Sequence, residues 1–134
     1  MNSIHKAGGI ILKDRRLLVT RSFGKDIFIA PGGKLEANES PEQALKREML
    51  EELAITIVPD TLEHIGTFHA EAAGRAGVQL RMDVYVINDY EGELSPSSEV
   101  EELMWINTRT TGVAIGSIFE HNVMPLLKQN NLID

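Results

Sequence analysis

The chain has 134 residues, 43% of them hydrophobic, and carries a formal net charge of −7. This is the length of one domain, whose core can bury roughly two-thirds of the unfolded surface. An acidic chain is disfavoured as a partner of nucleic-acid polymers, whose affinity for proteins comes mainly from Lys and Arg. The absence of cysteine excludes disulfides, thiolate metal sites and cysteine nucleophiles.

These properties predict a single domain over residues 1–134. No apolar run approaches the ~20 residues of a membrane span, and the N-terminus has only a very short apolar patch. We therefore expect a soluble, cytoplasmic protein with no membrane partner. Because the chain is acidic, a small phosphorylated substrate would need a bridging cation.

The first expected elements are strands at 4–12 and 16–22, joined by a tight turn. A short strand is expected at 27–30. Pro31 and the two glycines after it should end this strand, since proline lacks a backbone donor and glycine permits turns. A loop should then run to residue 38.

A helix is predicted from Pro41 to Leu53. Ser40 has the character of an N-cap, and Gln43 completes a capping box with it. The apolar residues of this segment recur at helical spacing and should face the core: Ala44, Leu45, Met49 and Leu53.

The later elements expected in chain order are strands at 62–70, 78–88 and 102–107 and a helix at 117–129. A turn-rich break at 73–77 separates the first two strands, and 91–99 is an acidic loop. Pro125 should kink or split the last helix. Strands interleaved with two helices indicate an α/β or α+β domain with a mixed sheet between the helices.

The predicted first helix is unusually rich in carboxylates. Glu48, Glu51 and Glu52 fall within an arc of roughly 100° beside the apolar stripe, so they should flank the core. Like charges at this spacing repel by about 1 kcal/mol per close pair in water. The nearby bases, Lys46 and Arg47, precede the acids, so the favourable Glu-to-Lys spacing is missing. The alternatives are a solvated acidic face and a site for a hard divalent cation such as Mg²⁺.

The segment 33–55 resembles the Nudix box. The resemblance rests on Gly33, on Glu39 and on the run REMLEELAI at 47–55, which stand at the family's fixed spacing. Ala54 is the one departure, because the family has glycine there. Alanine in the left-handed conformation would cost about 1 kcal/mol, so the helix exit is where we expect a difference from the family.

The resemblance implies a Nudix α/β/α sandwich that uses Mg²⁺ or Mn²⁺ to hydrolyse a phosphoanhydride bond in a nucleoside diphosphate linked to another moiety. It also implies residue roles. Glu48, Glu51, Glu52 and the Gly32 carbonyl would bind metal, Arg47 would orient the glutamates, and Gly33 and Glu39 would support the box.

In many Nudix enzymes the proton acceptor is a glutamate on a loop outside the box. The acidic loop offers Glu99, Glu101 and Glu102, and the residues before Glu99 favour it because Ser-Pro-Ser-Ser indicates a mobile segment. Each of the three has a solvated loop acid as its alternative. If none is the base, Glu48 becomes the leading candidate.

Substrate contacts are expected from Lys34, Phe28 and Phe68. A solvated lysine and two core aromatic residues are the alternative interpretations. The PGGKLE run resembles MutT-type enzymes and favours a (deoxy)nucleoside triphosphate. An ADP-ribose or nucleotide-sugar pyrophosphatase and a non-catalytic nucleotide sensor remain alternatives, as does a homodimeric state. Isopentenyl diphosphate isomerase is disfavoured because it relies on a cysteine.

Overall fold

The computed structural model describes residues 3–71 and 76–134. The strands are β1 (Ser3–Ile10), β2 (Leu12–Lys13), β3 (Arg16–Ser22), β4 (Gly32–Lys34), β5 (Thr56–Ile57), β6 (Leu62–Glu71), β7 (Gln79–Ile87), β8 (Tyr90–Glu91) and β9 (Val100–Ile106). The helices are α1 (Pro41–Leu53), a π-helical turn η1 (Phe119–Val123) and α2 (Met124–Gln129).

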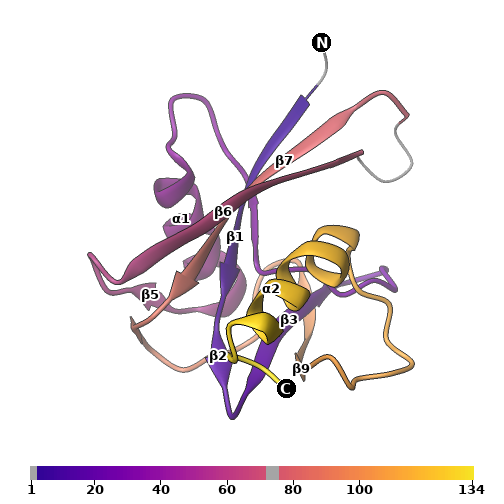
Figure 1. The fold of residues 1–134 in the computed structure, drawn as a ribbon. Coiled ribbons are helices and arrows are strands. Elements are labelled where there is room, and N and C mark those ends of the chain that lie inside the picture. Colours follow the sequence, from indigo (N-terminus) through magenta and orange to yellow (C-terminus); the bar gives the residue numbers. More distant parts are fainter. Residues whose placement is uncertain (1–2, 72–75) are drawn as a thin grey trace.

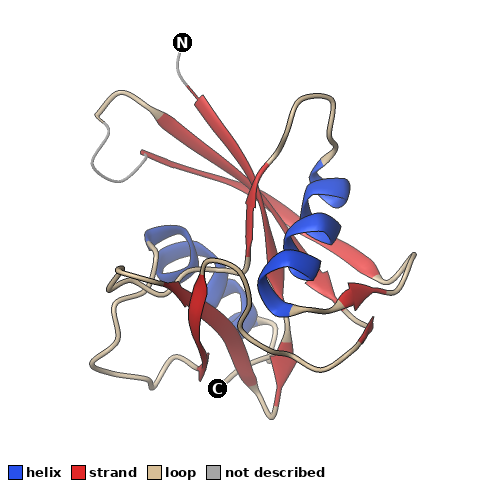
Figure 2. Ribbon diagram, turned by 180° about the vertical axis from the view of Figure 1, so that it is seen from behind, coloured by secondary structure: helices blue, strands red, loops and turns tan. Residues whose placement is uncertain are grey.

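The central sheet has the order β4-β1-β7-β6, in which β1 and β7 are parallel and the other pairs are antiparallel. A second sheet has the order β2-β3-β9, and β5 pairs with β8. Helices α1 and α2 lie on opposite sides of the strands (Figures 1 and 2). The predicted mixed sheet between two helices is therefore confirmed.

Two apolar cores fill the spaces between these layers. One joins the inner face of α1 to β1, β7 and the start of the loop after α1, and the other joins η1 and α2 to the opposite faces of β1, β3 and β7. A sheet covered on both faces must bury apolar side chains on both, which accounts for the largely apolar sequences of β3 and the C-terminal half of β7.

Helix α1 forms as its sequence predicts. The Ser40 hydroxyl accepts the Gln43 N–H at 3.1 Å, and the Gln43 side-chain oxygen accepts the Ser40 N–H at 2.9 Å, so the capping box is complete. All the expected core residues are buried, and they are Ala44, Leu45, Met49 and Leu53.

The strand expected at 27–30 is wrong. Only isolated bridges form there, between Ile29 and Thr20 and between Phe28 and Ile115. The glycines expected to end a strand instead belong to β4, which pairs antiparallel with β1. A sequence pattern that shows only apolar alternation cannot reveal this pairing, because β4 has no apolar side chain.

Backbone contacts explain why the glycine segment joins the sheet. Pro31 lacks a donor but its carbonyl accepts the Gly9 N–H at 2.8 Å. Gly32 has φ 137°, and a Cβ there would overlap the Ala7 carbonyl oxygen. The residue at 32 must therefore be glycine for β4 to lie against β1.

The last helix is helical over 117–129, as predicted, but it contains the π-helical turn η1. The Met124 N–H bonds to the Phe119 carbonyl, five residues earlier. Pro125 follows directly, and its ring would clash with the carbonyl four residues before it in a regular α-helix. The wider turn accommodates the proline without splitting the helix.

Other strand ends shift by one or two residues, and the short β5–β8 pair was not predicted. Of the turn expected at 73–77, residues 73–75 lie outside the described residues and 76–77 form a turn. No helix within residues 3–71 and 76–134 has the length and apolar character needed to cross a membrane.

Ala54 ends α1 in the left-handed conformation, with φ 58° and ψ 34°, and its N–H bonds to the Met49 carbonyl. The expected departure at the helix exit is therefore wrong, because alanine takes the conformation that glycine favours.

We predict that Ala54→Gly raises the free energy of unfolding by up to about 1 kcal/mol, since it removes the left-handed strain of alanine. Urea denaturation measures the change. Ala37, exposed in the loop before α1, is the control, and Ala37→Gly should lower stability because glycine makes the unfolded chain more flexible. A loss of stability in both variants would contradict the prediction.

Asp83 on β7 is a buried carboxylate that joins three strands. Its oxygens accept Thr67 Oγ1 at 2.5 Å and lie 3.0 Å from His64 Nε2 and 2.5 Å from His5 Nε2. Burial acts to raise the pKa of Asp83, but the hydrogen bonds from Thr67, His5 and His64 outweigh it and lower the pKa to about 2.

A carboxyl group with a lowered pKa contributes stability above its unfolded pKa, and this contribution is lost as pH falls through the folded value. Asp83→Asn should therefore destabilise the protein by about 2 kcal/mol at pH 6.5. The difference in free energy of unfolding between the variant and the parent protein should become smaller below pH 4. Urea denaturation at pH 6.5 and 3.5 measures both values, with exposed Asp26→Asn as the control. A gap independent of pH would argue against the charged network.

Candidate functional site

Arg47 is the centre of a network between α1 and the loop before it. Its Nε and Nη2 bind both oxygens of Glu39 at 2.9 and 3.0 Å, and its Nη1 binds Glu48 Oε1 at 2.8 Å. Its Nη2 also donates to the Lys34 carbonyl at 3.1 Å. The Arg47 hydrogen bond holds the pKa of Glu39 down at about 2. Such two-pronged pairing fixes both position and orientation.

This network corrects the expectation that the helix acids lack a basic partner. Arg47 reaches Glu48 directly, and its Nη1 lies 3.5 Å from Glu51 Oε2. The expectation that all three glutamates flank the core is also wrong for Glu51, whose side chain is 51% exposed, whereas that of Glu48 is 16% exposed. The three acids therefore lie in different surroundings.

Glu52 is half-buried beside β4. Its Oε1 accepts the Gly32 N–H at 2.9 Å, which joins the C-terminal part of α1 to the sheet. Burial, together with the charges of Glu48, Glu99 and Glu51, raises the pKa of Glu52 to about 7 against the opposing effect of the Gly32 bond. Burial also raises the pKa of Glu48, although Arg47 opposes it. The site thus favours added positive charge.

Gly33 leaves the space that the Glu48 carboxylate occupies. A Cβ on Gly33 would lie 2.7 Å from Glu48 Cδ and Oε1, closer than van der Waals contact allows. Glycine at this position therefore lets α1 bring Glu48 against β4.

The donor set fits a hard divalent cation, because it consists of carboxylate and carbonyl oxygens without sulfur. Across residues 3–71 and 76–134, no three His, Asp or Glu side chains converge closely enough to enclose an ion. The glutamates would have to turn toward a bound metal, and the Glu48–Arg47 bond is one contact that such a movement would alter.

The acidic loop lies against the C-terminal end of α1. The Ser97 and Ser95 N–H groups donate to the Glu52 and Leu53 carbonyls at 2.9 and 3.1 Å, satisfying carbonyls that a helix end leaves free. Glu99 follows, and its charge contributes to the raised pKa values of Glu48 and Glu52.

Glu101 and Glu102 have different partners. Both bind Arg21 on β3, with nitrogen-to-oxygen distances of 2.6 and 3.1 Å. Of the three acids considered as a proton acceptor, Glu99 is thus the one whose charge reaches the α1 glutamates.

Lys6 on β1 was missed from the sequence. Burial and the charge of Lys34 lower its pKa, and Glu52 and Glu48 act in the opposite direction. The register pairs Lys6 with Lys34 across β1 and β4, and the charge of Lys6 interacts both with Lys34 and with the α1 acids. Only the β1–β4 pairing, which the sequence did not reveal, brings Lys6 to this place.

The aromatic candidates differ in accessibility. Phe28 is only 6% exposed and belongs to the core, with the Arg21 guanidinium 5.9 Å from its ring centre. Phe68 is partly buried against the same core. Phe23, not considered from the sequence, is 62% exposed, and its N–H donates to the Glu99 carbonyl at 3.0 Å. Its position directly after the predicted 16–22 strand was the available signal.

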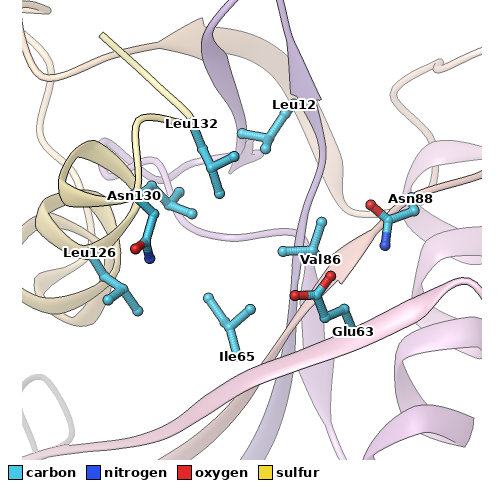
Figure 3. Close-up of a pocket in the computed structure, with 9 residues that line it drawn as sticks. Leu12, Glu63, Ile65, Val86, Asn88, Leu126, Asn130 and Leu132 are labelled. Atoms are coloured by element: carbon cyan, nitrogen blue, oxygen red, sulfur yellow. The ribbon is translucent and has the colours of Figure 1, made fainter.

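A cavity of about 300 Å³ lies between the end of α2 and the sheet. Figure 3 shows Leu126 and Asn130 on one side and Ile65, Val86 and Glu63 on the other. Its lining contains none of the candidate residues, so the cavity is separate from the α1 acids.

Glu52→Gln should stabilise the protein when no divalent cation is added. A carboxyl group whose pKa is raised in the folded state makes the protein less stable as pH rises. For Glu52 this loss occurs between its unfolded pKa of about 4.5 and its folded pKa of about 7. The variant should therefore gain about 1 kcal/mol at pH 8 and much less at pH 5. Thermal unfolding at both pH values measures this gain. Exposed Glu42→Gln, on the first turn of the same helix, is the control, and equal gains at both pH values would contradict the assignment.

Comparison with known proteins provides independent information. The NUDIX domain family pattern matches residues 4–119. A Danio rerio protein named oxidized purine nucleoside triphosphate hydrolase is 39% identical over 82 residues, which are 60% of this chain and 49% of that protein. The chain thus spans about half the length of that relative.

An 8-oxo-dGTP diphosphatase from Haemophilus influenzae is 33% identical over 108 residues, covering 77% of this chain and 75% of that protein. The crystal structure of a MutT protein from Methanosarcina mazei superposes with a TM-score of 0.76 over 97% of this chain and 96% of that one. At 20% identity, this last similarity concerns the fold alone.

Proposed function

Because the chain belongs to the Nudix hydrolase family, we propose that it is a Mg²⁺-dependent pyrophosphohydrolase whose substrate is a (deoxy)nucleoside triphosphate. The observation that carries the proposal is the docking of the loop that holds Glu99 on the end of α1 that carries Glu48 and Glu52. On the adjacent strands, two lysines, Lys6 and Lys34, pair across β1 and β4. The excess of negative charge calls for a cation, and the lysines suit a polyphosphate.

Glu48, Glu51, Glu52 and the Gly32 carbonyl would hold the metal. Mg²⁺ or Mn²⁺ held there would supply a lowered pKa for the attacking water and would neutralise charge on the phosphate oxygens. Arg47 orients Glu48 through its Nη1, while its Nε and Nη2 hold Glu39. Gly33 supplies the space that this arrangement requires.

The protein groups around the reaction have separate tasks. Glu99 accepts a proton from the attacking water as the water oxygen bonds to phosphorus and the bridging anhydride bond breaks. Lys6 and Lys34 attract the polyphosphate by charge. The reaction consumes one water and releases two phosphorylated products. When the substrate is a nucleoside triphosphate, these products are a nucleoside monophosphate and pyrophosphate.

The base preference is proposed from two facts. Both relatives described above are named for oxidised purine nucleoside triphosphates. Phe23 is exposed and its backbone N–H bonds to the Glu99 carbonyl, so its ring is available for a base to stack on. Phe28 and Phe68 would need to become more exposed to serve this purpose, so Phe23 takes the place first given to them. The overall charge of −7 favours free nucleotides over nucleic-acid polymers.

A substrate screen tests the proposal. Oxidised and normal purine triphosphates, CTP, ADP-ribose and a nucleotide sugar are incubated with Mg²⁺, and phosphate and pyrophosphate are quantified. We expect pyrophosphate from a purine triphosphate. Glu52→Gln should lower kcat by at least ~10²-fold, whereas exposed Glu42→Gln, on the first turn of the same helix, should not.

Two outcomes would contradict the proposal. Full turnover in excess chelator would exclude the metal requirement, and binding of nucleotides without turnover would indicate a sensor. Preferential hydrolysis of ADP-ribose or the nucleotide sugar would keep the reaction class but change the substrate.

A further inference from the structure

A β-bulge interrupts the pairing of β3 with β9 next to Glu99. Arg21 pairs with Glu102, but the following residue, Ser22, pairs with Val100. Glu101 is therefore the extra residue on β9. A bulge of this kind bends the strand and changes the direction of the side chains beyond it.

Arg21 binds the two glutamates at the bulge, Glu101 and Glu102. Its Nη1 lies 2.6 Å from Glu101 Oε1 and its Nη2 lies 3.1 Å from Glu102 Oε1. The same Nη1 donates to the Lys25 carbonyl at 3.1 Å. One guanidinium thus joins the start of β9 to the loop after β3, and it neutralises two adjacent glutamates that would otherwise repel each other.

The bulge determines which residues stand at the end of the pairing. Beyond it, Val100 is 3% exposed and the Glu99 carbonyl accepts the Phe23 N–H. If the bulge were lost and the register became regular, the residues before it would shift by one position along β3, about 3.3 Å, and Glu99 would no longer stand opposite Phe23. The distance between Glu99 and the α1 glutamates therefore depends on the extra residue.

We propose that Arg21 is a positioning residue that maintains the Glu101 bulge and thereby holds Glu99 in place for hydrolysis at α1. This inference rests on the proposed function, in which Glu99 accepts the proton. Exposed ion pairs add little to global stability, and the side chains of Glu101 and Glu102 are 42% and 46% exposed. The effect of Arg21 should hence appear in kcat more than in the melting temperature.

Activity measurements on four variants test the inference. Glu99→Gln should lower kcat by about 10²-fold and Arg21→Gln by at least ~10-fold, with KM changed by less than about 3-fold. The double variant should be no slower than Glu99→Gln, because displacing a base that is absent has no further effect. Arg21→Lys keeps the positive charge but lacks the planar guanidinium that binds two carboxylates. It should therefore show a smaller loss of kcat than Arg21→Gln.

Arg16→Gln is the matched control, since Arg16 is an exposed arginine at the hairpin end of the same strand, and it should retain normal kcat. A normal kcat in Arg21→Gln would overturn the inference. So would a double variant that shows the product of the two single losses, because Arg21 would then act independently of Glu99.

A second measurement does not depend on activity. Amide hydrogen exchange, read by NMR on the protein without nucleotide, should show faster exchange of the Phe23 N–H in Arg21→Gln and unchanged exchange in Arg16→Gln. If Glu99→Gln has normal kcat, the assignment of Glu99 as the base fails. The exchange rate of the Phe23 N–H then becomes the only test of the positioning role of Arg21. Unchanged exchange at Phe23 would then overturn the positioning role.

Discussion

The guanidinium of Arg47 joins three parts of the chain that must meet for a site to exist. It binds Glu39 in the loop before α1, Glu48 in α1 and the Lys34 carbonyl in β4. Glu39 and Glu48 are like charges close to one another, so without a shared cation between them they would separate. The position of α1 against β4, and with it the bond from Gly32 to Glu52, depends on this contact. The Nudix box is in this sense a packing motif as well as the source of the proposed metal ligands.

The parts of this arrangement that depend on local signals could be predicted from the sequence. Ser40 and Gln43 cap α1 through contacts between neighbours in the chain, and its apolar stripe needs only helical periodicity. A proline inside a helix, such as Pro125, likewise predicts an irregular turn from the sequence alone. Glu99 was favoured on weaker grounds, and its proximity to α1 comes from backbone bonds of Ser95 and Ser97 to helix carbonyls.

The remaining parts depend on pairing between distant segments, which periodicity does not encode. β4 has no apolar pattern, because two of its three residues are glycine, and its place is decided by how closely β1 can approach. Lys6 comes near the acids through that pairing, so the sequence alone could not predict its proximity to them. The spacing argument overlooked Arg47 as a partner of the acids, because it considered bases four residues after each glutamate, whereas this side chain binds the adjacent Glu48 and the preceding loop.

The two arginines divide the acids into two groups. Arg47 neutralises Glu39 and Glu48, and Arg21 neutralises Glu101 and Glu102, so four glutamates serve to hold loops in place. Within the described part of the chain, neither arginine forms an ion pair with Glu52 or Glu99. These two carboxylates are therefore not held by either arginine; one is half-buried against β4 and the other lies on the loop that docks on α1. In the proposed reaction this division separates two cases: Glu52 and Glu99 could act without releasing an arginine, whereas Glu48 would have to exchange its Arg47 contact for the metal. The arginines thus border the proposed site, and its centre is left to the two carboxylates that would meet the metal ion and the proton of the attacking water.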